Sequence, residues 1–117
     1  MATFRVGVTG IGYMGQLEAR ICGEMPGFEV VALHNRSPEK ASALAQELGC
    51  AAYETLDEML ERERLDALIV ATPNNAHLEP VAAAAAHGVN VFLEKPMGLH
   101  VAECREMIRV AESAGVV

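Results

Sequence analysis

Three glycines, Gly10, Gly12 and Gly15, follow the spacing G-x-G-x-x-G between an apolar segment at 4–8 and a segment with helical periodicity. Glycines so placed allow a tight turn, let the backbone approach a pyrophosphate and let a helix pack closely on a strand. The following helix directs its unpaired N–H groups and its positive dipole end at the anion. This context predicts a dinucleotide-binding loop, and the alternative is a glycine-rich turn without a ligand. The expected cofactor contacts of the loop are Gly10, Gly12, Tyr13, Met14 and Gly15.

The end of the second apolar segment bears on the type of cofactor. An acidic residue about 20 positions beyond the glycines normally binds the ribose hydroxyls of NAD. Here that position is Asn35, and Arg36 and Ser37 follow it. Asn35 places no carboxylate against a 2′-phosphate, and the Arg36 guanidinium can pair with one, so the sequence favours NADP over NAD. The alternative is a turn asparagine, a surface arginine and a serine that only caps a helix.

Two more polar clusters follow later apolar segments, where an open α/β sheet binds its ligands. They are A-T-P-N-N-A-H at 71–77 and Glu94-Lys95-Pro96. Lys95 is an ammonium that can bind or polarise a substrate oxygen or act as an acid, although a surface Glu-Lys pair before a turn is the default for this tripeptide alone. His77 either faces the cofactor or is a partly exposed packing residue in the first turn of a helix.

Apolar and amphipathic segments alternate along the chain, which predicts an α/β fold with a doubly wound, Rossmann-type parallel sheet of order 3-2-1-4-5. The periodicity of the first helix places Met14, Leu17, Ile21 and Met25 on one face. The periodicity of the last helix places Val101, Cys104, Ile108 and Ala111 on one face. Val116 and Val117 resemble a sixth strand cut short. The predicted strands are 4–8, 28–34, 51–53, 67–71 and 89–93. The first predicted helix ends at Met25 and the last ends at Ala114. The helices between them are Pro38–Leu48, Thr55–Arg62 and Val81–Ala86.

Composition limits the kind of partner. The 117 residues fit one domain, and a net charge of −7 opposes binding to nucleic acid or to an anionic membrane. A small molecule or a protein is the expected partner. The chain has neither a leader pattern nor an apolar run of membrane-spanning length, so we expect a cytoplasmic protein. Cys22, Cys50 and Cys104 lack the spacing of metal ligands and are expected to be reduced, packed thiols, so no metal site is predicted.

The motifs at 10–15, 71–77 and 88–96, taken together, resemble the N-terminal domain of the Gfo/Idh/MocA family of glucose-fructose oxidoreductase, inositol dehydrogenase and rhizopine catabolism proteins. The resemblance covers essentially the whole chain. It implies an NAD(P)-dependent oxidoreductase that moves hydride between nicotinamide and a hydroxyl or carbonyl carbon of a sugar or cyclitol. Lys95 resembles the catalytic lysine that contacts the substrate oxygen. The resemblance places Pro73, Asn74 and His77 in the nicotinamide and ribose pocket, and Glu94 and Pro96 in the turn around Lys95. Thr72 and Glu94 are also expected to contact the cofactor.

The chain departs from the family pattern in two ways. Asn35 stands where an aspartate is common, and residues 1–117 are expected to lie outside the second domain in which the family holds substrate and forms the oligomer interface. We therefore expect residues 1–117 to bind cofactor without turnover, within a homo-oligomeric enzyme, and to self-associate when isolated through uncovered apolar surface. The alternatives are a stand-alone dinucleotide-binding module or sensor, and an interaction protein on a degenerate Rossmann scaffold.

Overall fold

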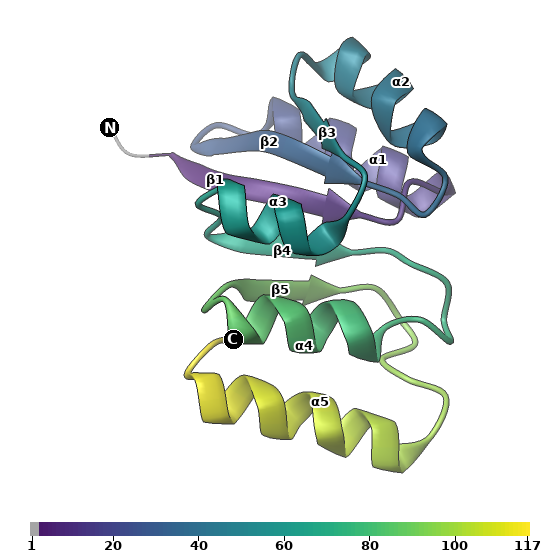
Figure 1. Ribbon diagram of the computed structural model, residues 1–117, viewed down its shortest axis with the longest axis vertical. Coiled ribbons are helices and arrows are strands. Elements are labelled where there is room, and N and C mark those ends of the chain that lie inside the picture. Colours follow the sequence, from purple (N-terminus) through teal and green to yellow (C-terminus); the bar gives the residue numbers. More distant parts are fainter. Residues whose placement is uncertain (1–2) are drawn as a thin grey trace.

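Five parallel strands lie side by side in the computed structural model, which describes residues 3–117 (Figure 1). The sheet has the predicted order β3-β2-β1-β4-β5. The middle strands read as continuous apolar runs because helices cover both of their faces. The strands are β1 (Phe4–Thr9), β2 (Phe28–His34), β3 (Ala51–Tyr53), β4 (Ala67–Val70) and β5 (Asn90–Leu93).

Helices lie on both faces of this sheet, as the doubly wound prediction requires (Figure 1). One apolar core joins the first two helices to β1 and β2, and a second core joins the other three helices to the opposite face. The chain therefore changes face between β3 and β4, which places the topological switch point at the carboxyl ends of β1 and β4. The helices are α1 (Tyr13–Glu24), α2 (Pro38–Leu48), α3 (Leu56–Arg62), α4 (Leu78–Ala86) and α5 (Val101–Ala114).

Local signals set the helix boundaries where the sequence predicts them. Ser37 is the N-cap of α2, and Gly49 ends that helix in the left-handed conformation at φ 72°. Thr55 accepts a hydrogen bond from the Glu58 N–H at 3.2 Å, which begins α3. The Glu58 carboxylate pairs with Arg62 at 3.3 Å, so the side chain of Glu58 follows the helix surface.

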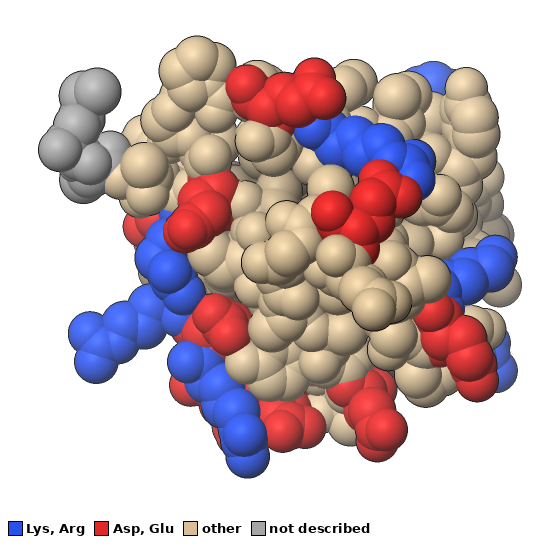
Figure 2. All heavy atoms as spheres, turned by 90° about the horizontal axis from the view of Figure 1, so that it is seen from above, with Lys and Arg blue, Asp and Glu red and all other residues tan. Residues whose placement is uncertain are grey.

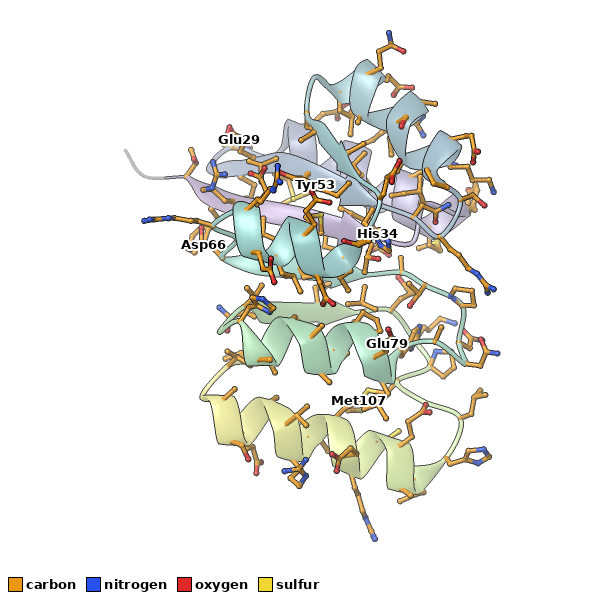
Figure 3. The ribbon with its side chains drawn as sticks, in the orientation of Figure 1. Glu29, His34, Tyr53, Asp66, Glu79 and Met107 are labelled. Carbon is orange, nitrogen blue, oxygen red and sulfur yellow. The ribbon has the colours of Figure 1, made fainter. Side chains whose placement is uncertain are left out.

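The buried faces of α1 and α5 differ from those that the apolar spacing indicates. Gly15, Ala19 and Cys22 are the buried residues of α1, whereas the larger apolar residues of that helix are exposed. Small side chains occupy the face of α1 that meets the sheet, because the helix lies close to the strands. In α5 the buried residue is Met107, which is 1% exposed and lies between α5 and α4, while Ile108 is exposed (Figure 3).

The last residue of the chain lies beside the first residues of β5. The Val117 carbonyl oxygen accepts the Val91 N–H at 2.8 Å, and the Val117 N–H donates to Asn90 Oδ1 at 2.9 Å. Val116 and Val117 are the residues that resemble the start of a sixth strand. The five strands described above form the whole sheet within residues 3–117.

An apolar groove of about 390 Å³ runs along the flank of α1 toward β5. Ile21 is 51% exposed and Phe92 60% exposed, although both are large apolar side chains. We call this feature the α1–β5 groove. Its lining residues are Val6, Glu18, Ile21, Cys22, Met25, Phe28, Ala67, Ile69 and Phe92.

We expect the 117-residue chain to self-associate through the α1–β5 groove, because exposed apolar surface is removed from water when two copies meet. Light scattering should give a mass that rises above 12.5 kDa with concentration. Ile21→Gln should move the mass toward the monomer. Leu99→Gln is the matched control, since Leu99 is 52% exposed and lies outside the groove. A monomer mass at every concentration would contradict the prediction.

Candidate dinucleotide-binding site

Gly10 makes the turn that follows β1. Its φ of +92° is a conformation that favours glycine, and its N–H donates to the His34 carbonyl oxygen at 3.0 Å. A Cβ at this position would lie 2.5 Å from the backbone nitrogen of Thr72 and 2.6 Å from the carbonyl oxygen of Ala71. The loop after β1 therefore lies directly against the loop after β4, and only glycine allows that approach.

The other two glycines of the loop have different surroundings. A Cβ on Gly15 would overlap the carbonyl oxygen of Gly10, so Gly15 lets α1 start against the turn. Gly12 is the N-cap of α1, and a Cβ there would meet nothing within 4 Å. The open space at Gly12, together with the first N–H groups of α1, fits a pyrophosphate. Tyr13 and Met14 are exposed beside this space.

Asn35 holds the glycine loop. Its Oδ1 accepts the Ile11 N–H at 2.8 Å, and its Nδ2 donates to the Ser37 carbonyl oxygen at 3.1 Å. A carboxylate could make the first bond but not the second, because it has no donor. Arg36 and Ser37 are exposed next to this link, and the Ser37 hydroxyl makes no capping bond within the described part of the chain.

A polar pair that the sequence did not reveal joins the buried Thr9 to the half-buried His34. Thr9 Oγ1 and His34 Nδ1 are 2.7 Å apart at the carboxyl ends of β1 and β2. Burial lowers the pKa of His34, which favours the neutral ring. A polar residue at the end of each of two adjacent apolar strands is the sequence signal that indicates such a pair.

His77 joins the loop after β4 to the loop after β5. It is 1% exposed, with Nε2 3.0 Å from the Thr72 carbonyl oxygen and Nδ1 3.1 Å from the Met97 carbonyl oxygen. The expectation of partial exposure is therefore wrong. His77 is the N-cap of α4, one residue before the first turn in which the sequence placed it. Thr72 donates its hydroxyl to the Ala76 carbonyl oxygen at 2.7 Å, while Pro73 and Asn74 are exposed on the same loop.

Glu94 and Lys95 follow β5 at the same edge of the sheet. The Glu94 N–H donates to the Val70 carbonyl oxygen at 3.0 Å, which continues the pairing of β4 with β5. The Lys95 N–H donates to Glu94 Oε1 at 3.3 Å, and the Lys95 side chain is exposed. Lys95 is thus exposed just beyond the carboxyl end of β5.

Glu18 is a further residue of the site that the sequence did not reveal. It lies on the flank of α1 that faces the α1–β5 groove, and its carboxyl is within hydrogen-bond reach of Glu94. Its signal in the sequence is a carboxylate one turn beyond Gly15, on a helix whose small residues are buried. Glu18 is therefore close to the site although it is far from β5 in the sequence.

The predicted residues thus come together along one edge of the sheet, from the glycine loop through Asn35 and the loop after β4 to Lys95. Acidic and basic side chains are interspersed on the molecular face in Figure 2, so that face lacks a single basic patch of the kind that binds nucleic acid. No helix within residues 3–117 is long and apolar enough to cross a membrane. The fold and the glycine cradle define a Rossmann-type dinucleotide-binding domain.

Comparison with known proteins names the family. Residues 4–117 match the family described as "Oxidoreductase family, NAD-binding Rossmann fold", and the chain belongs to this Gfo/Idh/MocA family. A crystal structure of GenD2 from gentamicin A biosynthesis, in complex with NAD, superimposes with a TM-score of 0.94 at 31% identity. That match covers 100% of this chain and 34% of GenD2. The resemblance predicted from the motifs is confirmed.

Characterised relatives act on different sugars and cyclitols, by their names. The chain is 44% identical to the 2,7-anhydro-N-acetylneuraminate hydratase of Mediterraneibacter gnavus, over 100% of this chain and 31% of the relative. It is 31% identical to scyllo-inositol 2-dehydrogenase (NADP(+)) IolU of Bacillus subtilis, over 97% of this chain and 35% of the relative. The chain thus spans about a third of the length of the curated relatives that it matches.

Proposed function

We propose that this chain is the NADP-binding domain of an oxidoreductase that transfers hydride between nicotinamide and a hydroxyl or carbonyl carbon of a sugar, a cyclitol or a similar small molecule. The observation that carries the proposal is the meeting of the glycine cradle, Asn35, the Thr72–His77 loop and Lys95 at one sheet edge. The bound cofactor would supply the hydride-transfer chemistry. The names of the relatives support the substrate class.

Each part of the edge has a distinct role in this proposal. Gly12 and the first turn of α1 receive the pyrophosphate, and the loop after β4 lies along the nicotinamide half. The exposed Lys95 ammonium contacts the substrate oxygen and stabilises negative charge on it. Turnover and homo-oligomer formation belong to the longer protein, since substrate must be held against the nicotinamide.

The preference for NADP rests on the residues after β2. The Asn35 side chain already binds the glycine loop, and it adds no negative charge beside the adenosine ribose. Arg36 is exposed next to it, in a position to pair with a 2′-phosphate. An arginine and a phosphate form a charge-assisted contact that NAD, which lacks the phosphate, does not make.

Calorimetric titration with NADPH and NADH, at matched ionic strength, tests the proposal. We expect tighter binding of NADPH, and we expect Arg36→Ala to weaken NADPH binding by about tenfold, because a hydrogen bond to a charged group contributes about 1.5–3 kcal/mol. The same change should leave NADH affinity within about twofold, as NADH makes no such contact.

Arg105→Ala is the matched control, since Arg105 is exposed on α5 at the opposite edge of the sheet from Arg36. It removes the same charge and should change neither affinity. Preference for NADH would contradict the NADP assignment and leave the cofactor domain in place. Failure to bind either nucleotide would contradict the cofactor domain itself.

A further inference from the structure

The Glu18 carboxyl occupies an unusual place for an acidic group. Both of its oxygens are closed off from solvent, and neither accepts a hydrogen bond from a donor within residues 3–117. Its neighbours in the α1–β5 groove include Ile21, Ile69 and Phe92, all apolar. A carboxylate without a donor in such surroundings is costly to keep ionised.

The polar group that Glu18 does reach is another carboxyl, that of Glu94. Phe92 of β5 lines the groove beside α1, and Glu94 lies two residues further on, just beyond the end of β5. The Glu94 N–H still pairs with the Val70 carbonyl oxygen, so the alternation of the strand continues and both side chains point to the side of the sheet that α1 covers. Two ionised carboxylates offer each other only acceptors. The contact becomes a hydrogen bond when one of the two carboxyls keeps a proton.

The surroundings show which carboxyl keeps it. Burial first, and then the hydrogen bond to Glu94 and the Glu94 charge, raise the pKa of Glu18 from its ordinary 4.5 to about 7. The bond from Glu18 is in turn the main cause that lowers the pKa of Glu94. Lys95 and His77 also favour the ionised form of Glu94, while the groove gives Glu18 only the neutral Cys22 thiol as a further titratable neighbour.

We propose that Glu18 is a positioning residue, whose protonated carboxyl donates a hydrogen bond to the Glu94 carboxylate and so holds that carboxylate, and with it the Lys95 backbone, at the nicotinamide end of the site. The role of that site rests on the proposed function. The pairing of Glu18 with Glu94 rests on the groove and on the contact between the two carboxyls. The Lys95 N–H donates to the same Glu94 carboxylate, so the chain of contacts runs from α1 to Lys95.

The proposal has a defined dependence on pH. In the folded chain Glu18 keeps its proton, and with it the hydrogen bond to Glu94, until the pH approaches about 7. Because the pKa of Glu18 is raised on folding, the stability that this bond contributes is fully present below about pH 4.5 and is lost as the pH rises through about 7. Above that pH, two like charges face each other behind Lys95. The Glu94 carboxylate is then pushed from its place.

NADH is the probe for the test, because it has no 2′-phosphate that titrates near neutral pH. In the 117-residue chain we expect NADH affinity to fall at least about fivefold between pH 6 and pH 9. Glu18→Gln keeps a donor that does not titrate, so its affinity should stay within about twofold over that range. Glu18→Ala removes the donor and should bind weakly at both pH values.

A second measurement reads the pair without cofactor. Carbon NMR of the side-chain carboxyls should show Glu18 titrating near pH 7, and Glu18→Ala should raise the midpoint of Glu94 while Glu18→Gln leaves it low. An ordinary midpoint for Glu18 would overturn the proposal. A Glu18 midpoint near 7 with NADH affinity that is flat in pH would overturn the positioning role. Expected carboxyl midpoints without any NADH binding would contradict the proposed function and leave the pair standing.

Discussion

Gly15→Ala is expected to lower the free energy of unfolding by about 3 kcal/mol or more and to abolish dinucleotide binding. The added Cβ overlaps the carbonyl oxygen of Gly10, and both groups belong to backbone that cannot rotate away. Relief requires α1 to move off the turn, which also shifts its N-terminus from the pyrophosphate position. Urea unfolding followed by nucleotide titration measures both effects.

Gly12→Ala separates folding from binding in the same loop. A Cβ at Gly12 meets nothing within 4 Å, and the φ of −86° suits alanine, so the unfolding free energy should change by no more than about 1 kcal/mol. Nucleotide affinity should still fall by at least about tenfold, because the methyl group takes the space of the phosphates. Wild-type affinity in Gly12→Ala, or wild-type stability in Gly15→Ala, would contradict these assignments.

His77→Ala is expected to lower the unfolding free energy by about 2–5 kcal/mol. The change opens a cavity at a fully buried position and removes the ring from the carbonyl oxygens of Thr72 and Met97. The loops after β4 and β5 should then move independently, which also weakens nucleotide binding. Urea unfolding and hydrogen exchange of the two loops measure the effect.

His87→Ala is the control for that change. His87 also places Nδ1 near a carbonyl oxygen, that of Ala83 at 2.9 Å, but it is exposed at the end of α4. Its replacement should change stability by no more than about 0.5 kcal/mol. Equal losses in the two variants would show that His77 does not hold the loops together.

The order of the sheet could be predicted because each of its signals is local. For example, Ser37 and Gly49 predict the start and the end of the Pro38–Leu48 helix, and the structure confirms both boundaries. The buried helix faces could not be predicted in the same way. On α1 the distance to the sheet decides what is buried, so Ala19 is covered while Ile21 is not.

The site shows the same division. Its residues lie where the sequence put them, at the strand ends, because parallel strands carry their carboxyl ends to one edge. Their partners were not predictable, since Asn35 binds the glycine loop and Glu18 reaches Glu94 across β4, through contacts between segments far apart in the chain. Cofactor preference depends on such contacts and stays a prediction.

Phe4 begins β1, and Val117 lies against the start of β5, so both face the amino ends of the strands, away from the glycine loop (Figure 1). A fluorescent protein or a surface tether attached at either end would therefore leave the nucleotide edge open. Since both attachment points are on one side, the unit can be spliced as a cassette into a surface turn of a host protein. A sensor for reduced nucleotide built this way would report from the side opposite the proposed nucleotide site.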